Sequence, residues 1–440
     1  MPPSPSAPVA PPAVGSERGM IIDLPLRWVL IIVVFSRLLI AANWVWLQDF
    51  GLGDVPYYVD RAGMLADLGV GVTLREYPTP LAGLLFLPWL LGGGQEGAYL
   101  FWFVTLVLVA DLALCVLLWR SGLPGRGWAI VVWSAVGALL GPLIWLRVDL
   151  FPAVLVGAGA LLMVTRPAVA GVLLALGAGL KLWPGVLAGF LVDRNVLRRG
   201  SWRTPVLAFA GTGVLIVVLS VAAGGWDRLV SPLTWQSDRG LQIESVPATA
   251  LMALHAGDPN TWAVQMSHYQ AFELFGPGVA ETLVVSDVLT LVGALVGVLV
   301  LVRSWLAPAA DRFARTETVA IGMLAAISLL IVTNKTLSPQ YVIWLAGPLA
   351  VLVALRGFRV RRTRRLVALV GLVAGLTHLV YPVWYGHLNG MDPHPVGTPL
   401  GTAALVARNL LLVVLTVVTV HASLFTNRPK ERADTMPSGL

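Results

Sequence analysis

Nine long apolar runs constrain what this chain can fold into. They occupy residues 24–46, 97–119, 127–146, 204–223, 284–303, 316–334, 340–356, 364–384 and 401–424. A helix needs about 20 consecutive apolar residues to cross the hydrocarbon core of a bilayer. The composition agrees, because 57% of the residues are hydrophobic and only 12% are charged, which is too apolar for an ordinary soluble surface. We therefore predict an all-α polytopic membrane protein.

Between residues 147 and 193 the apolar sequence is divided by charged residues into three pieces of roughly 12 to 15 residues. Such pieces are short for full crossings, but three short helices around a membrane-embedded cavity would use them. Counting them gives about twelve transmembrane helices. One further short run, residues 80–93, is bounded by prolines and glycines and could either span the membrane or lie on its outer surface.

The basic residues decide between these two readings of residues 80–93. If this run lies on the outer surface, most of the 30 basic residues fall on the side of the N-terminus, as the positive-inside rule expects for the cytosol. We therefore predict an outer-surface helix there. The predicted organisation is a disordered cytosolic tail at 1–23, a transmembrane domain at 24–426 with outer loops at 47–96 and 225–283, and a cytosolic tail at 427–440. Because this topology explains the net charge of +7, no nucleic-acid partner is expected.

Lys181 lies inside the otherwise apolar stretch LGAGLKLWPG. A charge at the bilayer centre costs about 2.5 to 3.5 kcal/mol, so such a residue needs a partner or a function. Pro184 breaks the helix, and a broken helix at membrane depth is tolerated where the backbone is buried in protein or lines a cavity. We predict that Lys181 faces a cavity.

Three other cations, Arg147, Arg239 and Lys335, map with Lys181 to the outer ends of helices or to the outer loops. Several cations around one outer cavity suit an anionic lipid whose phosphate needs charge neutralisation. For Arg147, which lies in the segment WLRVDLFPA, an ion pair with Asp149 is an equally open reading.

The first outer loop carries two candidate acids. Asp54 follows the first predicted helix, where a carboxylate could act as a general base toward a sugar hydroxyl. A helix N-cap or a solvated loop acid is the alternative reading. Glu76, which precedes Tyr77 and Pro78, has the same two readings: it lines a site, or it starts the surface helix.

Two more polar segments could reach the same cavity. In the second outer loop, WQSDRGLQIES contains Arg239, Gln242 and Glu244, and the alternative is a solvated loop. The turn NKTLSPQYVIWL contains Lys335 and Gln340, with Ser338 before Pro339 in a pattern that also starts helices.

Metal and nucleotide motifs are missing from the sequence. There is no glycine-rich phosphate loop, no HExxH motif, and only one cysteine, Cys115, which lies in an apolar run and is predicted to pack there. We expect no cofactor and no metal.

The segments GDVPYY, EYPTP, RVDLFPA, KLWP, DRGLQIES and NKTLSPQYVIWL, in this order, resemble the actinobacterial membrane glycosyltransferases of family 87. These are related to the polyprenyl-phosphate-mannose-dependent mannosyltransferase that extends phosphatidylinositol mannosides. The resemblance covers roughly residues 24–424 and implies a C-class glycosyltransferase fold with an active site on the outer side. It also implies a polyprenyl-phosphate sugar donor and a catalytic base at Asp54. The sequence departs from the family at Thr79, between two prolines, and around Asp149, where the family often has a Gly-Gln pair.

On this basis we predict an inverting transfer of a sugar to a lipid or glycan acceptor at the outer face of the cell membrane, in cell-envelope lipoglycan synthesis. The resemblance implies that the sugar is mannose. Asp54 is the predicted base, and Lys181, with Arg147, Arg239 and Lys335, is predicted to bind the donor phosphate. The weaker candidates for substrate contacts are Tyr58, Glu76, Tyr77, Asp149, Glu244 and Gln340. The alternative is a transporter or flippase of a polyprenyl-linked sugar, which internal repeats would favour. The sequence shows none.

Overall fold

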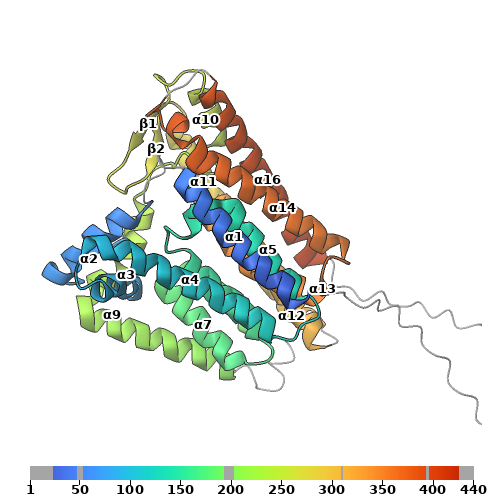
Figure 1. The fold of residues 1–440 in the computed structure, drawn as a ribbon. Coiled ribbons are helices and arrows are strands. Elements are labelled where there is room, and N and C mark those ends of the chain that lie inside the picture. Colours follow the sequence, from blue (N-terminus) through green and yellow to red (C-terminus); the bar gives the residue numbers. More distant parts are fainter. Residues whose placement is uncertain (1–22, 47–52, 193–202, 309–310, 393–395, 426–440) are drawn as a thin grey trace, which may run out of the picture.

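The computed structural model describes residues 23–46, 53–192, 203–308, 311–392 and 396–425, and most of these residues are helical (Figure 1). Among them, nine helical stretches are long and apolar enough to cross a membrane. They are α1 (Leu26–Trp46), α4 (Glu96–Arg120), α5 (Arg126–Leu140) with the 3₁₀ turn η2 (Gly141–Ile144), α9 (Arg203–Ser237), α11 (Val279–Leu306), α12 (Arg312–Thr333), α13 (Ile343–Arg356) preceded by η4 (Pro339–Val342), α14 (Arg361–His378) with the π turn η5 (Leu379–Val383), and α16 (Gly397–Phe425). Each one coincides with a predicted apolar run, and the prediction of an all-α polytopic membrane protein is confirmed.

Shorter helices complete the bundle. The divided region forms α6 (Leu150–Leu162), α7 (Pro167–Leu180) and the 3₁₀ helix η3 (Trp183–Leu191), and the first predicted outer loop forms α2 (Val55–Leu68) and α3 (Thr79–Leu91). At 1.5 Å per residue, the 13 residues of α3 extend for about 20 Å, which is short for a bilayer core of about 30 Å. The total of about twelve crossings stays a prediction. The predicted tails lie almost entirely outside the described residues.

Helix α13 lies at the centre of the bundle. It packs against α5, α6 and α12, and every residue from Ile343 to Leu355 is buried. It lies very close to α6, because a Cβ atom on Gly347 would lie only 2.8 Å from the Cα atom of Gly157. Such close backbone contact through small residues is how membrane helices gain packing energy without a hydrophobic driving force between them.

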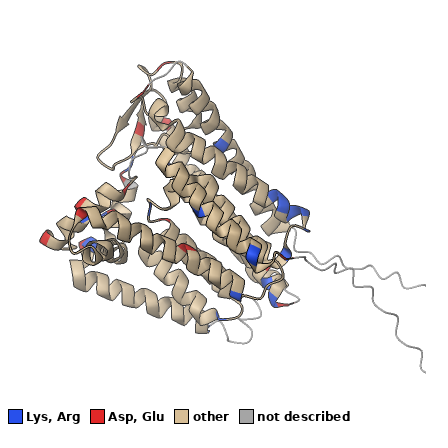
Figure 2. Cartoon of the chain, in the orientation of Figure 1, with Lys and Arg blue, Asp and Glu red and all other residues tan. Residues whose placement is uncertain are grey.

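Basic side chains collect at one end of the helices (Figure 2). The N–H of Gly125, just before α5, donates to the carbonyl of Ala354 near the end of α13, with a nitrogen to oxygen distance of 2.8 Å. The N–H of Gly127 donates to Asp23 just before α1, and Glu317 on α12 pairs with arginines from the end of α13 and the start of α14. We call this the arginine-rich end; its residues are Arg126, Arg303, Arg312, Arg356, Arg361, Arg362, Arg364 and Arg365. Helices α1, α5, α12 and α14 all begin there.

The second predicted outer loop is more structured than the sequence suggested. Helix α9 bends at Gly225, whose φ of 79° favours glycine, and then continues to Ser237. After it come α10 (Thr249–His255) and an antiparallel hairpin of β1 (Ala263–Met266) and β2 (Phe272–Phe275). This hairpin was not predicted.

Arg228 ties the two loops together. Its guanidinium is buried and donates to the backbone carbonyls of Val70, Leu74 and Tyr77, at distances of 2.9 to 3.0 Å. These carbonyls lie in the first predicted outer loop, and Arg228 lies on the second part of α9, in the second predicted outer loop. The hydrogen bonds therefore fix the two loops against each other. This brings the polar segments of both loops to one place.

Candidate active site

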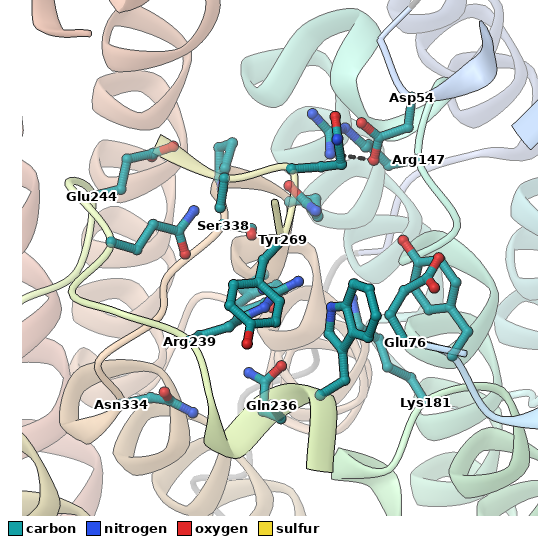
Figure 3. Close-up of a pocket in the computed structure, with 18 of the residues that line it drawn as sticks. Asp54, Glu76, Arg147, Lys181, Gln236, Arg239, Glu244, Tyr269, Asn334 and Ser338 are labelled. Atoms are coloured by element: carbon teal, nitrogen blue, oxygen red, sulfur yellow. Dashed lines mark hydrogen bonds and ion pairs between the residues drawn. The ribbon is translucent and has the colours of Figure 1, made fainter. Parts of the chain in front are cut away.

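A cavity of about 630 Å³ lies at the end of the bundle opposite to the arginine-rich end. Figure 3 shows residues that line it. Its lining includes segments that follow α1, α5 and α12, all of which begin at the arginine-rich end. Eight of the predicted site residues line it: Asp54, Glu76, Tyr77, Arg147, Lys181, Arg239, Glu244 and Gln340. Residues 93 to 286 positions apart from Asp54 therefore meet around one space, as the sequence predicted from the topology alone.

Asp54 forms an ion pair with Arg147. Its Oδ2 atom accepts this bond and a hydrogen bond from the Tyr58 hydroxyl, at 3.2 Å. Among the described residues, the other carboxylate oxygen, Oδ1, has no hydrogen-bond partner, and the side chain is 26% exposed. Burial raises the pKa of Tyr58, so its hydroxyl stays protonated and can donate. One oxygen of Asp54 is thus held and the other is available.

The alternative readings of Asp54 and Arg147 can now be compared with the structure. Asp54 precedes the first residue of α2, but its side chain forms no N-cap hydrogen bond. Arg147 pairs with Asp54, and the open reading in which it pairs with Asp149 is wrong. Its Nη2 atom also donates to the hydroxyl of Tyr381, at 3.0 Å.

Lys181 lies just after the end of α7, with an extended backbone (φ −152°, ψ 135°). Its Nζ donates to Oδ1 of Asp149, at 2.7 Å, and the same oxygen accepts from Nε1 of Trp344, at 2.8 Å. Aromatic rings of Tyr341 and Trp344 lie 4.8 and 5.5 Å from Nζ, within the range of a cation–π contact. The predicted helix break is confirmed, and the partner that Lys181 required is Asp149.

Arg239 differs from the other two cations in the cavity. Within the part of the chain that the structure describes, no carboxylate pairs with it and its buried Nε has no hydrogen-bond partner. Figure 3 shows it beside Tyr269 in the middle of the drawn residues. The charges of Arg147 and Lys181 are each balanced by an aspartate, whereas that of Arg239 is available to an anion.

Glu244 lies in the wall of the cavity and is paired with Arg408 of α16. The Nη1 atom of Arg408 donates to Oε2 of Glu244, at 2.7 Å, and both side chains are at most 1% exposed. Burial raises the pKa of Glu244, and the guanidinium of Arg408 acts in the opposite direction. The second-loop segment is therefore a buried part of the site, and the reading as a solvated loop does not hold for Glu244.

Glu76 accepts a hydrogen bond of 2.5 Å from the hydroxyl of Tyr57. Burial, followed by the nearby charge of Glu76, raises the pKa of Tyr57, so this hydroxyl stays a donor. Glu76 lines the cavity and does not begin α3, whose first residue is Thr79.

Three predicted residues do not line the cavity. Tyr58 and Asp149 are buried behind it and hold Asp54 and Lys181, respectively. Lys335 lies next to the lining residue Asn334, and its carbonyl accepts from the N–H of Gln242, at 3.1 Å. Any contact of the Lys335 side chain with substrate stays a prediction.

The site also contains residues that the sequence did not single out, namely Tyr381, Trp344 and Arg408. Arg408 carried the same signal as Lys181, since it is an isolated charge in an apolar run. The two aromatic residues had no such signal, because most aromatic residues of a membrane protein are packing or interface residues. Among the described residues, no group of three or more His, Cys, Asp or Glu side chains could hold a metal ion.

A bundle of membrane helices with a polar, ion-paired cavity at one end defines a polytopic membrane protein with a substrate site. The family model of glycosyltransferase family 87 matches residues 77–333, which is more than half of the chain. The chain belongs to this family, as its sequence resemblance predicted, and is therefore a membrane glycosyltransferase. No curated protein is significantly similar to it in sequence. The match includes Lys181, Arg239 and Glu244, whereas Asp54 and Gln340 lie outside it.

Proposed function

We propose that this glycosyltransferase transfers a sugar from a polyprenyl-phosphate donor to a lipid or glycan acceptor, with inversion, at the outer face of the membrane. The observation that carries the proposal is that two complementary groups line one cavity. Asp54 is a carboxylate with an available oxygen, and Arg239 is a guanidinium with no carboxylate partner among the described residues. Membership of a glycosyltransferase family favours this activity over transport of a lipid-linked sugar.

The distribution of charge supports the proposed side of the membrane. Lysine and arginine are enriched on the cytosolic side of membrane proteins. The arginine-rich end is then cytosolic, and the cavity, which lies at the opposite end, opens to the outer face. Sugar nucleotides are made in the cytosol in most cells, so a donor used at the outer face has to be linked to a lipid. The sequence resemblance to enzymes related to a polyprenyl-phosphate-mannose-dependent mannosyltransferase supports such a donor, and mannose is the sugar we propose.

In the proposed reaction, Oδ1 of Asp54 takes the proton of an acceptor hydroxyl as the oxygen attacks the anomeric carbon. The new carbon–oxygen bond forms on one face of the sugar while the bond to the phosphate oxygen breaks on the other face. Polyprenyl phosphate leaves with the bonding electrons, and the anomeric configuration is inverted. Arg147 holds Oδ2 of Asp54 through the ion pair, so that Oδ1 is the oxygen that faces the acceptor hydroxyl.

The leaving phosphate needs positive charge close by, and Arg239, Lys181 and Arg147 line the same cavity. Arg239 is the strongest of these ligands in our proposal, because it does not have to share its charge with an aspartate. Lys181 has further N–H donors after its bond to Asp149, and Asp149 holds it in place. Glu76, Tyr77, Glu244 and Gln340 are available for substrate contacts.

The proposal is tested by supplying two donors to the purified protein in vesicles that contain candidate lipid acceptors. We expect transfer from polyprenyl-phosphate mannose and none from a nucleotide-linked mannose, with an inverted anomeric configuration in the product by NMR. Transfer from the nucleotide-linked sugar, or retention of configuration, would contradict the proposed donor and mechanism.

Removing Lys181 is expected to affect both folding and donor binding. In Lys181→Met, the nearly buried carboxylate of Asp149 loses its cation, and breaking a buried pair in this way costs about 3 to 5 kcal/mol, so the melting temperature should fall. The double variant Lys181→Met/Asp149→Asn removes both charges and keeps an acceptor for Trp344. It should recover the melting temperature but keep a KM for the donor raised about tenfold or more, corresponding to about 1.4 kcal/mol. A wild-type donor KM in the folded double variant would exclude Lys181 as a phosphate ligand.

A further inference from the structure

We propose that Gln242, Glu244 and Gln340 form a wall that binds the hydroxyl groups of a sugar ring, at a place in the cavity separate from the phosphate. We call this the acceptor wall, because it presents hydrogen-bond acceptor oxygens to the cavity. It rests on the proposed function, because it names the part of that site which recognises the sugar.

The acceptor wall combines three buried oxygen atoms. The three side chains line the cavity, and they are 6%, 1% and 6% exposed, respectively. Within the described residues, Oε1 of each one is buried and has no hydrogen-bond partner. A buried acceptor left without a hydrogen bond is unfavourable, so three of them on one cavity suggest that a donor from outside the protein occupies this place.

Glu244 is held in a fixed orientation by α16. Arg408 donates to its Oε2, at 2.7 Å, and to its backbone carbonyl, at 2.6 Å. The amide of Asn409 donates to Ser245 and Thr249, at 3.3 and 2.8 Å, and so fixes the adjacent backbone. Replacing such a buried ion pair by apolar residues is often neutral or stabilising, so the pair is weak evidence for a role in stability alone. Its geometry instead holds one carboxylate oxygen for Arg408 and leaves the other for a ligand.

The chemistry of these groups selects a hydroxyl. A carboxylate oxygen needs a hydrogen-bond donor and repels a phosphate. The phosphate of the sugar donor therefore does not bind at Glu244. The amides of Gln242 and Gln340 each carry a donor and an acceptor, and a hydroxyl matches them in either orientation of the amide. Water, like a hydroxyl, both donates and accepts hydrogen bonds. A sugar ring can replace ordered water when its hydroxyls reproduce the hydrogen bonds of that water. A polyhydroxylated ring is therefore the ligand class that fits.

Within the acceptor wall, Glu244 lies apart from Lys181, which we assign to the phosphate. Figure 3 shows Glu244 on the opposite side of the drawn residues from Lys181, with Arg239 between them. A ligand with a hydroxyl-rich part and an anionic part could then contact Glu244 and Arg239 together. The ring could be that of the donor or that of the acceptor, which share this chemistry.

The test titrates the full-length protein in detergent with neutral methyl α-glycosides of mannose, glucose and galactose. Tryptophan fluorescence is a suitable readout, because Trp183, Trp235 and Trp344 line the cavity. We expect the wild-type protein to bind at least one glycoside with a Kd on the order of 1 mM, as suits a small neutral ligand. The double variant Gln242→Leu/Gln340→Leu should bind it at least tenfold more weakly. Gln265→Leu, on the exposed part of β1, is the control and should bind like the wild type.

Two results would overturn the acceptor wall: no glycoside binds the wild-type protein, or the double variant binds as tightly as the wild type with an unchanged melting temperature. If the double variant fails to fold, the single variants Gln242→Met and Gln340→Met, which keep nearly the same side-chain length and remove the amide with its acceptor oxygen, take its place and should each bind the glycoside more weakly than the wild type. Binding of polyprenyl phosphate without a sugar is measured separately and should be unchanged in the variants. If the wild-type protein does not bind polyprenyl phosphate, the proposed donor is contradicted, but the glycoside titration still tests the acceptor wall. Competition of the glycoside with the donor or with the acceptor then identifies the source of the ring, and either pattern supports the wall.

Discussion

Asp54→Asn is expected to slow sugar transfer by about 10² to 10⁴-fold, the usual contribution of a general base, with little change in the KM for the donor. Asparagine has nearly the same shape as aspartate and keeps an oxygen that can accept from Arg147 and Tyr58. It cannot take the proton of the acceptor hydroxyl, because an amide is not basic. The rate is measured as transfer of radiolabelled sugar from polyprenyl-phosphate mannose to the acceptor.

The matched control is Asp60→Asn on α2, the helix that Asp54 precedes. The Asp60 side chain is 64% exposed and does not line the cavity, so the change removes one carboxylate from α2 without touching the site. It should transfer sugar at the wild-type rate. Asp54→Asn with full activity would exclude Asp54 as the base, and equal losses in both variants would indicate an effect of charge on the helix and not of proton transfer.

The long spans of the fold were predictable because one physical requirement determines them. A membrane helix has to satisfy its backbone hydrogen bonds internally over about 20 apolar residues, and this requirement is visible in any single run such as that of α4 or α11. The hairpin of β1 and β2 was not predicted, since its residues AVQM and FELF show no strong alternation and their pairing depends on the structure around them.

The site was predictable as a set of charges but not as a set of partners. Because α1, α5 and α12 begin at one end, the segments after them meet at the other, and topology alone brings Asp54, Arg147 and Gln340 together. Which aspartate pairs with Arg147 depends on side-chain positions. The near neighbour Asp149 was a reasonable partner from sequence, but the structure places Asp54, 93 residues away, against Arg147.

The same difference explains why Arg408 was missed. An isolated charge in an apolar run indicates that a partner exists, as Lys181 showed, but it does not say where the partner lies. Arg408 finds Glu244 at a distance of 164 residues in sequence. A search for every isolated charge in the predicted spans would have found Arg408 as well as Arg37 and Asp111, which pair across α1 and α4.

The second large effect is expected for Arg239→Gln, which should raise the KM for the polyprenyl-phosphate donor about 10- to 150-fold. A hydrogen bond to a charged group contributes about 1.5 to 3 kcal/mol, and this range of free energy corresponds to that change in affinity. Among the described residues no carboxylate pairs with Arg239, so its removal leaves no buried charge without a counterion. The melting temperature should therefore stay close to that of the wild type, in contrast to Lys181→Met.

Arg75→Gln is the control for this variant, because Arg75 is exposed in the first loop, does not line the cavity and loses the same charge. If both variants raise the donor KM equally, and if added salt removes the effect, the cause is the general field at this end of the protein. If only Arg239→Gln raises it, and if binding of polyprenyl phosphate without a sugar weakens to the same extent, the contact is to the phosphate. A donor KM unchanged in Arg239→Gln would leave the phosphate to Lys181 and Arg147, which each share their charge with an aspartate. The comparison thus decides whether the phosphate is bound by the cation without a carboxylate partner or by the two that are already paired.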